Sequence, residues 1–238
     1  MYRVWAALAV AGLVACGSPK DPVDDLRREL ANFPEYSVIV DDLRVEDGFS
    51  DAYFLRFKIL SAKGGRVADK DTLVYEERQT QEYEVDYSIF QRYENYLGMV
   101  VASKTLDGRQ SDVRQAHPPG YQYVGNQQYG YWNSGGFWAF YGQYAFMSQM
   151  MGGWGVNRAD YGDYRRRYES GSPYYGPEKN GRSTFGTRGT TTQKTRPSFY
   201  ARQASRQAAS RQSFSRTVQS RSGKGAGQSA GSSWGRGK

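Results

Sequence analysis

Cysteine, histidine and long hydrophobic runs are scarce in this sequence of 238 residues. The single cysteine, Cys16, excludes an intrachain disulfide, so a folded region must be stabilised by its own core. The single histidine, His117, limits any Ser-His-Asp or Cys-His catalytic arrangement to that residue. The longest apolar run, Val4 to Ala15, has 12 residues, whereas a membrane-spanning helix needs roughly 20. We therefore expect no transmembrane anchor.

Acidic residues are absent from the last part of the chain. Residues 181–238 contain 12 basic residues and no acidic ones, whereas residues 21–115 contain 20 acidic and 13 basic residues. An acidic folded part followed by a basic tail predicts that the tail contacts an anionic surface. A second interpretation is that the basic residues only keep the tail soluble.

The apolar run near the amino terminus follows Arg3 and has the length of a signal-peptide core. At its end, Leu13-Val14-Ala15-Cys16 resembles the lipobox of bacterial lipoproteins, in which a leucine lies three residues before an invariant cysteine. The resemblance covers about the first 20 residues. It implies a diacylglyceryl group on the Cys16 thiol, cleavage before Cys16 and, in many bacteria, acylation of the new amine. Two or more acyl chains anchor a protein stably.

The residue after the cysteine bears on localisation. The family's usual signal for retention in the inner membrane is an aspartate there, and Gly17 departs from it. The resemblance thus implies a lipid-anchored protein of the cell envelope, on the periplasmic face of the outer membrane where a bacterium has two membranes. The alternative is an ordinary secretory leader with an incidental cysteine.

The chain after the leader predicts an α+β fold, with one N-terminal helix packed on a small antiparallel sheet. We expect a signal peptide at 1–15, a lipidated tether at 16–22 and a small α+β domain at 23–116. A helix is predicted over Asp21–Asn32, because Asp21 can cap it, Pro22 suits its first turn, and apolar residues share one face. Strands are predicted at Tyr36–Val45, Ala52–Leu60, Thr72–Glu76, Gln79–Tyr87 and Leu97–Lys104, turns at Asp47-Gly48, Lys63-Gly64-Gly65 and Asp107-Gly108, and either a helix or a strand at Ser88–Tyr96.

Residues 117–180 form a region rich in Tyr, Gly and Trp, which we expect to be weakly ordered because aliphatic residues become sparse. One helix is predicted over Phe137–Met151, where apolar residues fall near one face. Three interpretations stay open. The helix could lie in a membrane interface, exposed aromatic residues such as Trp132, Trp138 and Trp154 could stack on cell-wall sugars, or the aromatics could cover the sheet or remain a disordered, adhesive region.

Residues 181–238 predict a disordered basic tail, with a transient helix around Phe199 to Ala209. Export makes nucleic acid an improbable partner for its arginines. Anionic lipid, lipopolysaccharide and cell-wall polymers carry comparable charge and are the expected contacts.

Catalytic and metal-binding patterns are weak. His117 lies where the amino-acid composition of the chain changes. We interpret it as a linker residue and not as the catalytic histidine of a hydrolase. Glu82, Glu84 and Asp86 alternate along one strand, which indicates a solvated sheet face more than a glycosidase or calcium site. We expect no metal, no cofactor and no enzyme activity. The hypothesis is a non-enzymatic envelope lipoprotein, and its alternative is a glycan- or peptidoglycan-binding accessory module.

Overall fold

A computed structural model describes residues 20–48, 50–67, 70–151, 153 and 155–222. The signal peptide, the tether up to Pro19 with Cys16, Trp154 and the last 16 residues, 223–238, lie outside the described residues. The chain divides into two compact units, Met1–Thr192 and Gln193–Lys238. The first unit is a mixed α+β structure built on an antiparallel sheet, which confirms the predicted fold class at this level.

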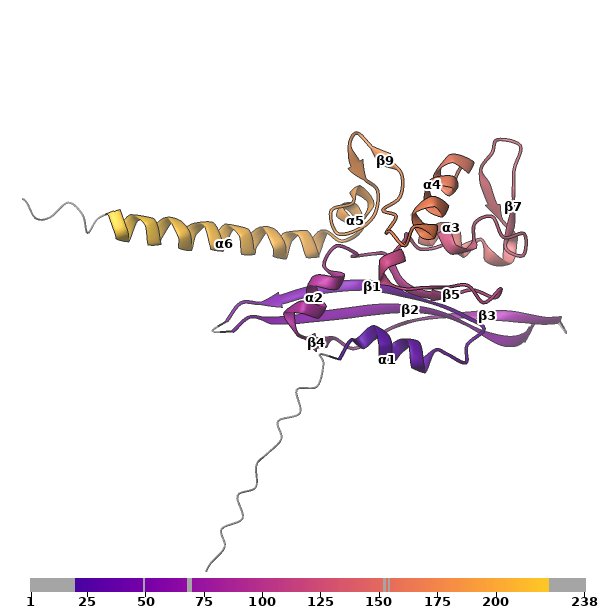
Figure 1. Ribbon diagram of the computed structural model, residues 1–238, viewed down its shortest axis with the longest axis horizontal. Helices are drawn as coiled ribbons and strands as arrows, with labels where there is room; N and C mark the ends of the chain where they lie inside the picture. Colours follow the sequence, from indigo (N-terminus) through magenta and orange to yellow (C-terminus); the bar gives the residue numbers. More distant parts are fainter. Residues whose placement is uncertain (1–19, 49, 68–69, 152, 154, 223–238) are drawn as a thin grey trace, which may run out of the picture. The chain divides into compact units, whose positions relative to one another are not determined.

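The sheet has the strand order β3-β2-β1-β5-β6, and β4 pairs with β2 beside this path. All of its neighbouring strands run antiparallel (Figure 1). The strands are β1 (Glu35–Glu46), β2 (Ala52–Val67), β3 (Lys70–Gln79), β4 (Tyr83–Val85), β5 (Val100–Lys104) and β6 (Gln110–Ser111).

The strands mostly follow the alternation of apolar and polar residues in the sequence, but two predictions need correction. The turn predicted at Lys63-Gly64-Gly65 does not form, because β2 continues through it and pairs Gly64 with Leu73 of β3. A strand tolerates an internal glycine, although the glycine makes the strand less stable. The strand predicted at Gln79–Tyr87 is confined to Tyr83–Val85, and the ambiguous segment after it begins a helix, α2 (Tyr87–Tyr93).

Helix α1 (Pro22–Glu29) covers one face of the sheet (Figure 1). The Asp21 side chain caps it by accepting a hydrogen bond of 3.0 Å from the Val23 amide, as the sequence predicts. Val23, Leu26 and Leu30 share one side of the helix and are buried. This helix is one of six among the described residues, and the predicted small domain contains α2 in addition to the N-terminal helix.

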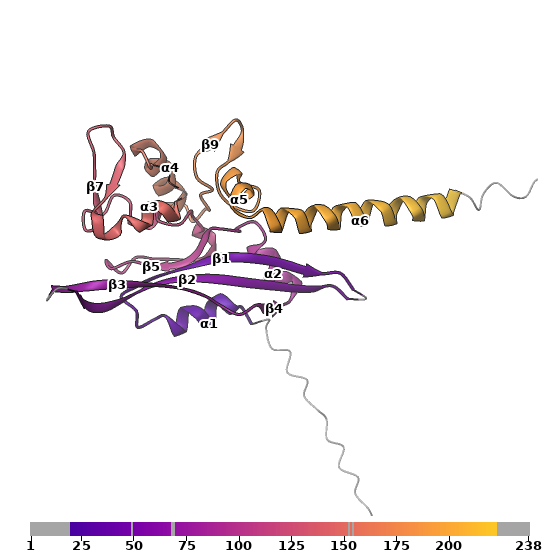
Figure 2. The same ribbon diagram turned by 180° about the vertical axis from the view of Figure 1, so that it is seen from behind.

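The opposite face of the sheet carries a second layer made from residues 116–192 (Figures 1 and 2). Its core consists mainly of tyrosines, in one cluster around Tyr121, Tyr164 and Trp138 and another around Tyr123 and Tyr129. The region that the sequence predicts to be weakly ordered is therefore folded. Its elements are η2 (Tyr121–Tyr123), β7 (Gly130–Trp132), β8 (Trp138–Phe140), η3 (Gly142–Tyr144), α3 (Phe146–Met150), α4 (Arg158–Glu169), β9 (Glu178–Lys179), β10 (Arg182–Ser183) and the start of α5 (Thr190–Thr195). The short helix η1 (Val113–Gln115) precedes the layer.

Two predictions for this layer need correction. The helix expected over Phe137–Met151 exists only as α3, because its first part forms β8 and pairs with β7. The tail expected to be disordered from residue 181 contributes Phe185 and Thr192 to the buried interior. The sequence around Phe185 and Thr192 is polar and shows no helical or strand periodicity, so their packing could not be predicted.

The second unit contains α6 (Pro197–Ser222), a helix of 26 residues that encloses the predicted transient helix. Alanine, arginine and glutamine, which favour helices, dominate its first half. The predicted disorder of residues 223–238 lies outside the described residues.

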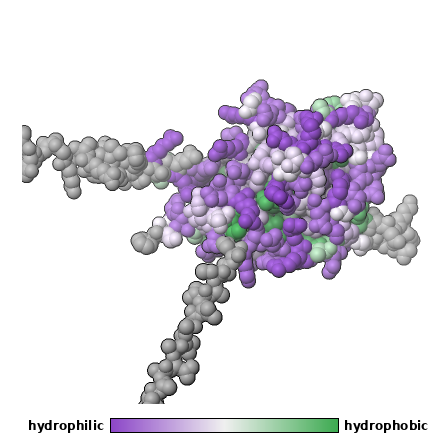
Figure 3. Space-filling view, in the orientation of Figure 1, coloured by the Kyte–Doolittle hydropathy of each residue, from purple (hydrophilic) through white to green (hydrophobic). Residues whose placement is uncertain are grey.

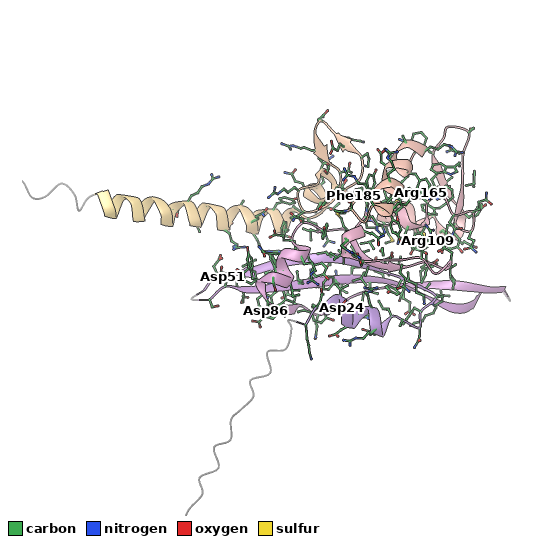
Figure 4. All side chains as sticks on the ribbon, viewed as in Figure 1. Asp24, Asp51, Asp86, Arg109, Arg165 and Phe185 are labelled. Atoms are coloured by element: carbon green, nitrogen blue, oxygen red, sulfur yellow. The ribbon has the colours of Figure 1, made fainter. Side chains whose placement is uncertain are left out.

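The surface seen in Figure 3 is mostly hydrophilic, with hydrophobic residues in small, separate patches. The two sides of the sheet can be told apart by labelled side chains in Figure 4. Asp24 lies on the α1 side of the sheet, whereas Arg165 and Phe185 lie in the layer on the other side. Asp51 and Asp86 mark one end of the sheet.

Candidate functional site

A chain of buried polar groups connects the sheet to the tyrosine layer. His117 Nδ1 lies 2.9 Å from the carbonyl oxygen of Gln115, and Nε2 lies 3.1 Å from the side-chain amide of Gln122. That amide also lies 2.7 Å from the Ser37 hydroxyl on β1, which lies 3.4 Å from the Tyr123 hydroxyl. His117, Gln122, Ser37 and Tyr123 are all buried, so these contacts replace their bonds to water.

The protonation state of His117 sets the orientation of this chain. Complete burial lowers the pKa of its imidazole below the ordinary value of 6.5, so the ring is neutral at pH 7. A neutral ring has one N–H, which Nδ1 donates to the Gln115 carbonyl. The structure places Gln122 Oε1 beside His117 Nε2 and has Gln122 Nε2 donating to Ser37 Oγ. Because Nε2 of the neutral ring needs a donor, the reversed amide, which donates to Nε2 and accepts from Ser37, fits this ring. Amide orientation follows from such networks.

His117 acts in this geometry as a connector inside the core. A serine hydrolase places a hydroxyl on one imidazole nitrogen and a carboxylate on the other, whereas His117 contacts an amide and a backbone carbonyl. The residue also exchanges two backbone hydrogen bonds with Val100. The interpretation of His117 as a linker residue is therefore wrong, because the segment around it packs onto the sheet.

Glu35 is a fully buried carboxyl group in the same interface, with 0% of its surface exposed. The Tyr129 hydroxyl donates a 2.5 Å hydrogen bond to Oε2. Burial raises the pKa of Glu35, and hydrogen bonding from Tyr129 opposes this effect. Glu35 Oε1 and the Tyr75 hydroxyl are both buried without a hydrogen bond of normal geometry, although Tyr75 lies close enough to lower the pKa of the carboxyl. A proton on Oε1 would satisfy both atoms by donating to Tyr75.

The three carboxylates singled out in the sequence, one on β4 and one on each side of it, are exposed. Glu82 forms an ion pair with Arg44 at 2.7 Å, and Glu84 is exposed. Asp86 precedes α2 without capping it through its side chain. Within the described part of the chain, no group of three or more His, Cys, Asp or Glu residues could hold a metal ion.

The three tryptophans named as candidate contacts have different positions. Trp138 is buried, with 7% of its surface exposed, and packs edge-on against Trp132 at a centroid distance of 5.2 Å. Trp132 is half-buried between Tyr161 and the Arg158 guanidinium, which lies 4.8 Å from the ring centre. Trp154 lies outside the described residues. Trp138 thus serves the interior rather than a ligand.

The exposed aromatic residues of this hairpin are on its other side. Tyr131, Phe137 and Tyr141 are 52%, 46% and 43% exposed. The rings of Tyr131 and Tyr141 lie 5.8 Å apart with an interplanar angle of 34°. We call Tyr131, Phe137, Ala139 and Tyr141 the hairpin face. The hairpin face was not predicted from the sequence. Only the alternation of side chains along β7 and β8 places these rings on the side opposite to Trp132 and Trp138.

The amino-terminal end of the folded unit is fixed tightly. Asp21 caps α1 and also accepts hydrogen bonds from the Tyr93 hydroxyl at 2.8 and 2.9 Å and from Arg92 at 2.7 Å. Tyr93 is buried, so the chain enters the core directly at Asp21. Asp21, which is held by these contacts, lies five residues after Cys16 in the sequence.

Together these features define an α+β protein whose sheet lies between α1 and a tyrosine-rich layer with an exposed aromatic hairpin. Comparison with protein-family models, curated proteins and solved structures gives no match. Among the helices of the described residues, none is long and apolar enough to cross a membrane.

Proposed function

We propose that this chain is a bacterial envelope lipoprotein, held on a membrane by lipid on Cys16, which acts by binding and not by catalysis. The observation that carries the proposal is the lipobox Leu13-Val14-Ala15-Cys16 at the end of an apolar run too short to span a membrane. Gly17 in place of aspartate favours the periplasmic face of an outer membrane.

The position of Asp21 supports this arrangement. Five residues can span at most about 17 Å when extended. A lipid on Cys16 would thus hold α1 close to the bilayer surface, because Asp21 is already fixed by Tyr93 and Arg92.

The basic carboxyl-terminal part supplies the proposed contact with anionic envelope surfaces. Residues 197–238 contain eight basic residues and no acidic ones. In the described part of α6, Arg202, Arg206 and Arg211 are exposed. Lipid head groups, lipopolysaccharide phosphates and anionic wall polymers are the partners with matching charge.

Cell fractionation with a Cys16→Ala variant tests the anchor. The wild-type chain should remain with the membranes and incorporate a labelled fatty acid. The variant should lose the label and leave the membrane fraction on detergent-free extraction at high salt. Ser18→Ala, which leaves the lipobox intact, is the matched control and should behave as wild type. A Cys16→Ala protein with unchanged membrane association and unchanged mobility would contradict the proposal.

A further inference from the structure

The hairpin face combines exposed rings with a rigid support. In the register of the hairpin, Tyr131 lies opposite Ala139, and Trp132 lies opposite Trp138. Since side chains alternate along a strand, the tryptophan pair turns inward and Tyr131 turns outward. Tyr141 follows Ala139 by two residues and so returns to the outer side. The buried Trp138 therefore fixes the backbone that displays the two tyrosines.

The small size of Ala139 keeps this face shallow. Ala139 ends at its Cβ atom, directly opposite Tyr131 and two residues before Tyr141. The two rings, 5.8 Å apart, are inclined by only 34°. Their spacing is comparable with that of successive pyranose rings in an extended polysaccharide, and aromatic rings pack well on the C–H faces of such sugars.

The segment that contains the hairpin face carries no charge, and the Arg158 guanidinium that follows it lies over Trp132, a residue that turns to the inner side of the hairpin. Residues 115–157 contain no Asp, Glu, Lys or Arg. Exposed amides take their place, which can donate and accept hydrogen bonds at the same time. The exposed amide side chains nearest in sequence are Gln127, Gln128, Asn133 and Gln143. Aromatic rings with amide side chains nearby suit a neutral partner that has many hydroxyl groups and flat apolar faces.

The location of the hairpin argues against the membrane as its partner. Helix α1 and the hairpin of β7 and β8 lie on opposite faces of the sheet (Figures 1 and 2). A lipid on Cys16, which belongs to the proposed function, would place α1 towards the bilayer and the hairpin face away from it. Membrane-surface segments are also typically rich in Lys and Arg, which this stretch lacks.

We propose that the hairpin face is a binding site for a neutral β-1,4-linked polysaccharide, whose sugar rings stack on Tyr131 and Tyr141. Phe137, directly before β8, extends the apolar contact, and the neighbouring amides bind sugar hydroxyls. This inference names a partner for the proposed envelope protein, but the binding does not require the lipid.

Binding of two defined probes to the full-length protein in detergent tests the proposal. The probes are the hexamers of N-acetylglucosamine and of glucose, and calorimetry measures their dissociation constants. The wild-type protein should bind at least one hexamer. The double variant Tyr131→Ala/Tyr141→Ala should weaken this binding at least tenfold, whereas Tyr131→Phe/Tyr141→Phe should retain most of it because the rings remain.

Tyr87→Ala is the matched control, because Tyr87 is also 52% exposed and also packs on another tyrosine, Tyr53. It should bind as wild type, and so should Cys16→Ala, which separates sugar binding from anchoring. Thermal unfolding verifies that each variant is folded. No binding of either hexamer, or equal binding by the Ala double variant, overturns the proposal. So does binding to phosphatidylcholine vesicles that the Ala double variant loses, which would assign the face to membranes.

Discussion

Tyrosine takes the place of leucine and isoleucine in the layer above the sheet. Tyr123 and Tyr129 are fully buried, with rings 4.9 Å apart, and their hydroxyls lie beside Ser37 and Glu35 of β1. A buried ring contributes a large apolar area, but its hydroxyl needs a partner. The sheet provides these partners from the first residues of β1, where Glu35 and Ser37 are buried.

Glu35→Gln should change how stability depends on pH. Below the ordinary pKa of 4.5 the carboxyl is protonated in both the unfolded and the folded chain. Above it, the unfolded chain loses the proton while the folded chain, with its raised pKa, keeps it. Wild-type stability therefore falls as pH rises from 4.5 towards the folded pKa, by at most about 1.4 kcal/mol per pH unit. The variant should lack this loss.

Urea unfolding of both proteins between about pH 4 and 8 measures the difference. The two free energies of unfolding should converge at the acidic end, and the variant should become the more stable protein as pH rises. His117 acts in the opposite sense, because its lowered pKa removes stability as pH falls below 6.5, but both proteins share this effect. A constant difference across the range would show that Glu35 is ionised throughout.

At the scale of single elements, the first helix depends on one carboxylate. Asp21→Ala removes the cap of α1 and leaves the Tyr93 hydroxyl without its acceptor. We expect a loss of about 1–3 kcal/mol in the free energy of unfolding. The control is Asp25→Ala, which removes only an exposed ion pair with Arg28 and should cost less than about 1 kcal/mol. Equal losses in both variants would contradict the role of the cap.

The hairpin of β7 and β8 requires glycine at one position. A Cβ atom on Gly130 would lie 2.2 Å from the Ala139 carbonyl oxygen, which the backbone pairing of the two strands does not allow. Gly130→Ala should therefore open the hairpin, lower the melting temperature and expose Trp138 to fluorescence quenchers. Gly142→Ala, where nothing lies within 4 Å of the added atom, should change stability by less than about 1 kcal/mol. A Gly130→Ala protein with wild-type stability and quenching would refute this geometry.

The elements that could be predicted from the sequence are those with conventional signals. The helix at Asp21 has a cap, a proline and an apolar face. Strand β1 is rich in β-branched residues, and in β2 apolar and polar residues alternate. That the aromatics cover the sheet was one of the interpretations left open, but the sequence could not select it, because tyrosine is weakly hydrophobic on hydropathy scales although it packs well. The hairpin face could not be predicted for a related reason. Composition alone does not show that Tyr131 is exposed while its neighbour Trp132 turns to the interior.

At the scale of the whole molecule, charge separates along the chain. Acidic residues outnumber basic ones over residues 21–115, whereas α6 and the residues after it carry only positive charge. The charge of the carboxyl-terminal part implies an electrostatic partner, while the neutral stretch 115–157 implies a different one. One chain would then hold three separate attachments: lipid, polysaccharide and an anionic surface.

The electrostatic attachment should depend on charge and not on the lipid. In a Cys16→Ala background, Arg202→Gln/Arg206→Gln/Arg211→Gln should weaken binding to phosphatidylglycerol vesicles, and the corresponding triple lysine variant should not. Binding of the parent should fall steeply between about 0.05 and 0.5 M salt, because screening shortens the reach of exposed charges. Sedimentation with vesicles measures both effects. Binding indifferent to salt, or equal in the two triple variants, would rule out an electrostatic contact.

Mass spectrometry of the native protein purified from bacterial membranes tests the anchor most directly. Our account predicts a chain that begins at Cys16 and carries a diacylglyceryl group on its sulfur. A chain that retains residues 1–15, or that begins at Cys16 with a free thiol, would contradict the lipid anchor and the orientation of the molecule inferred from it.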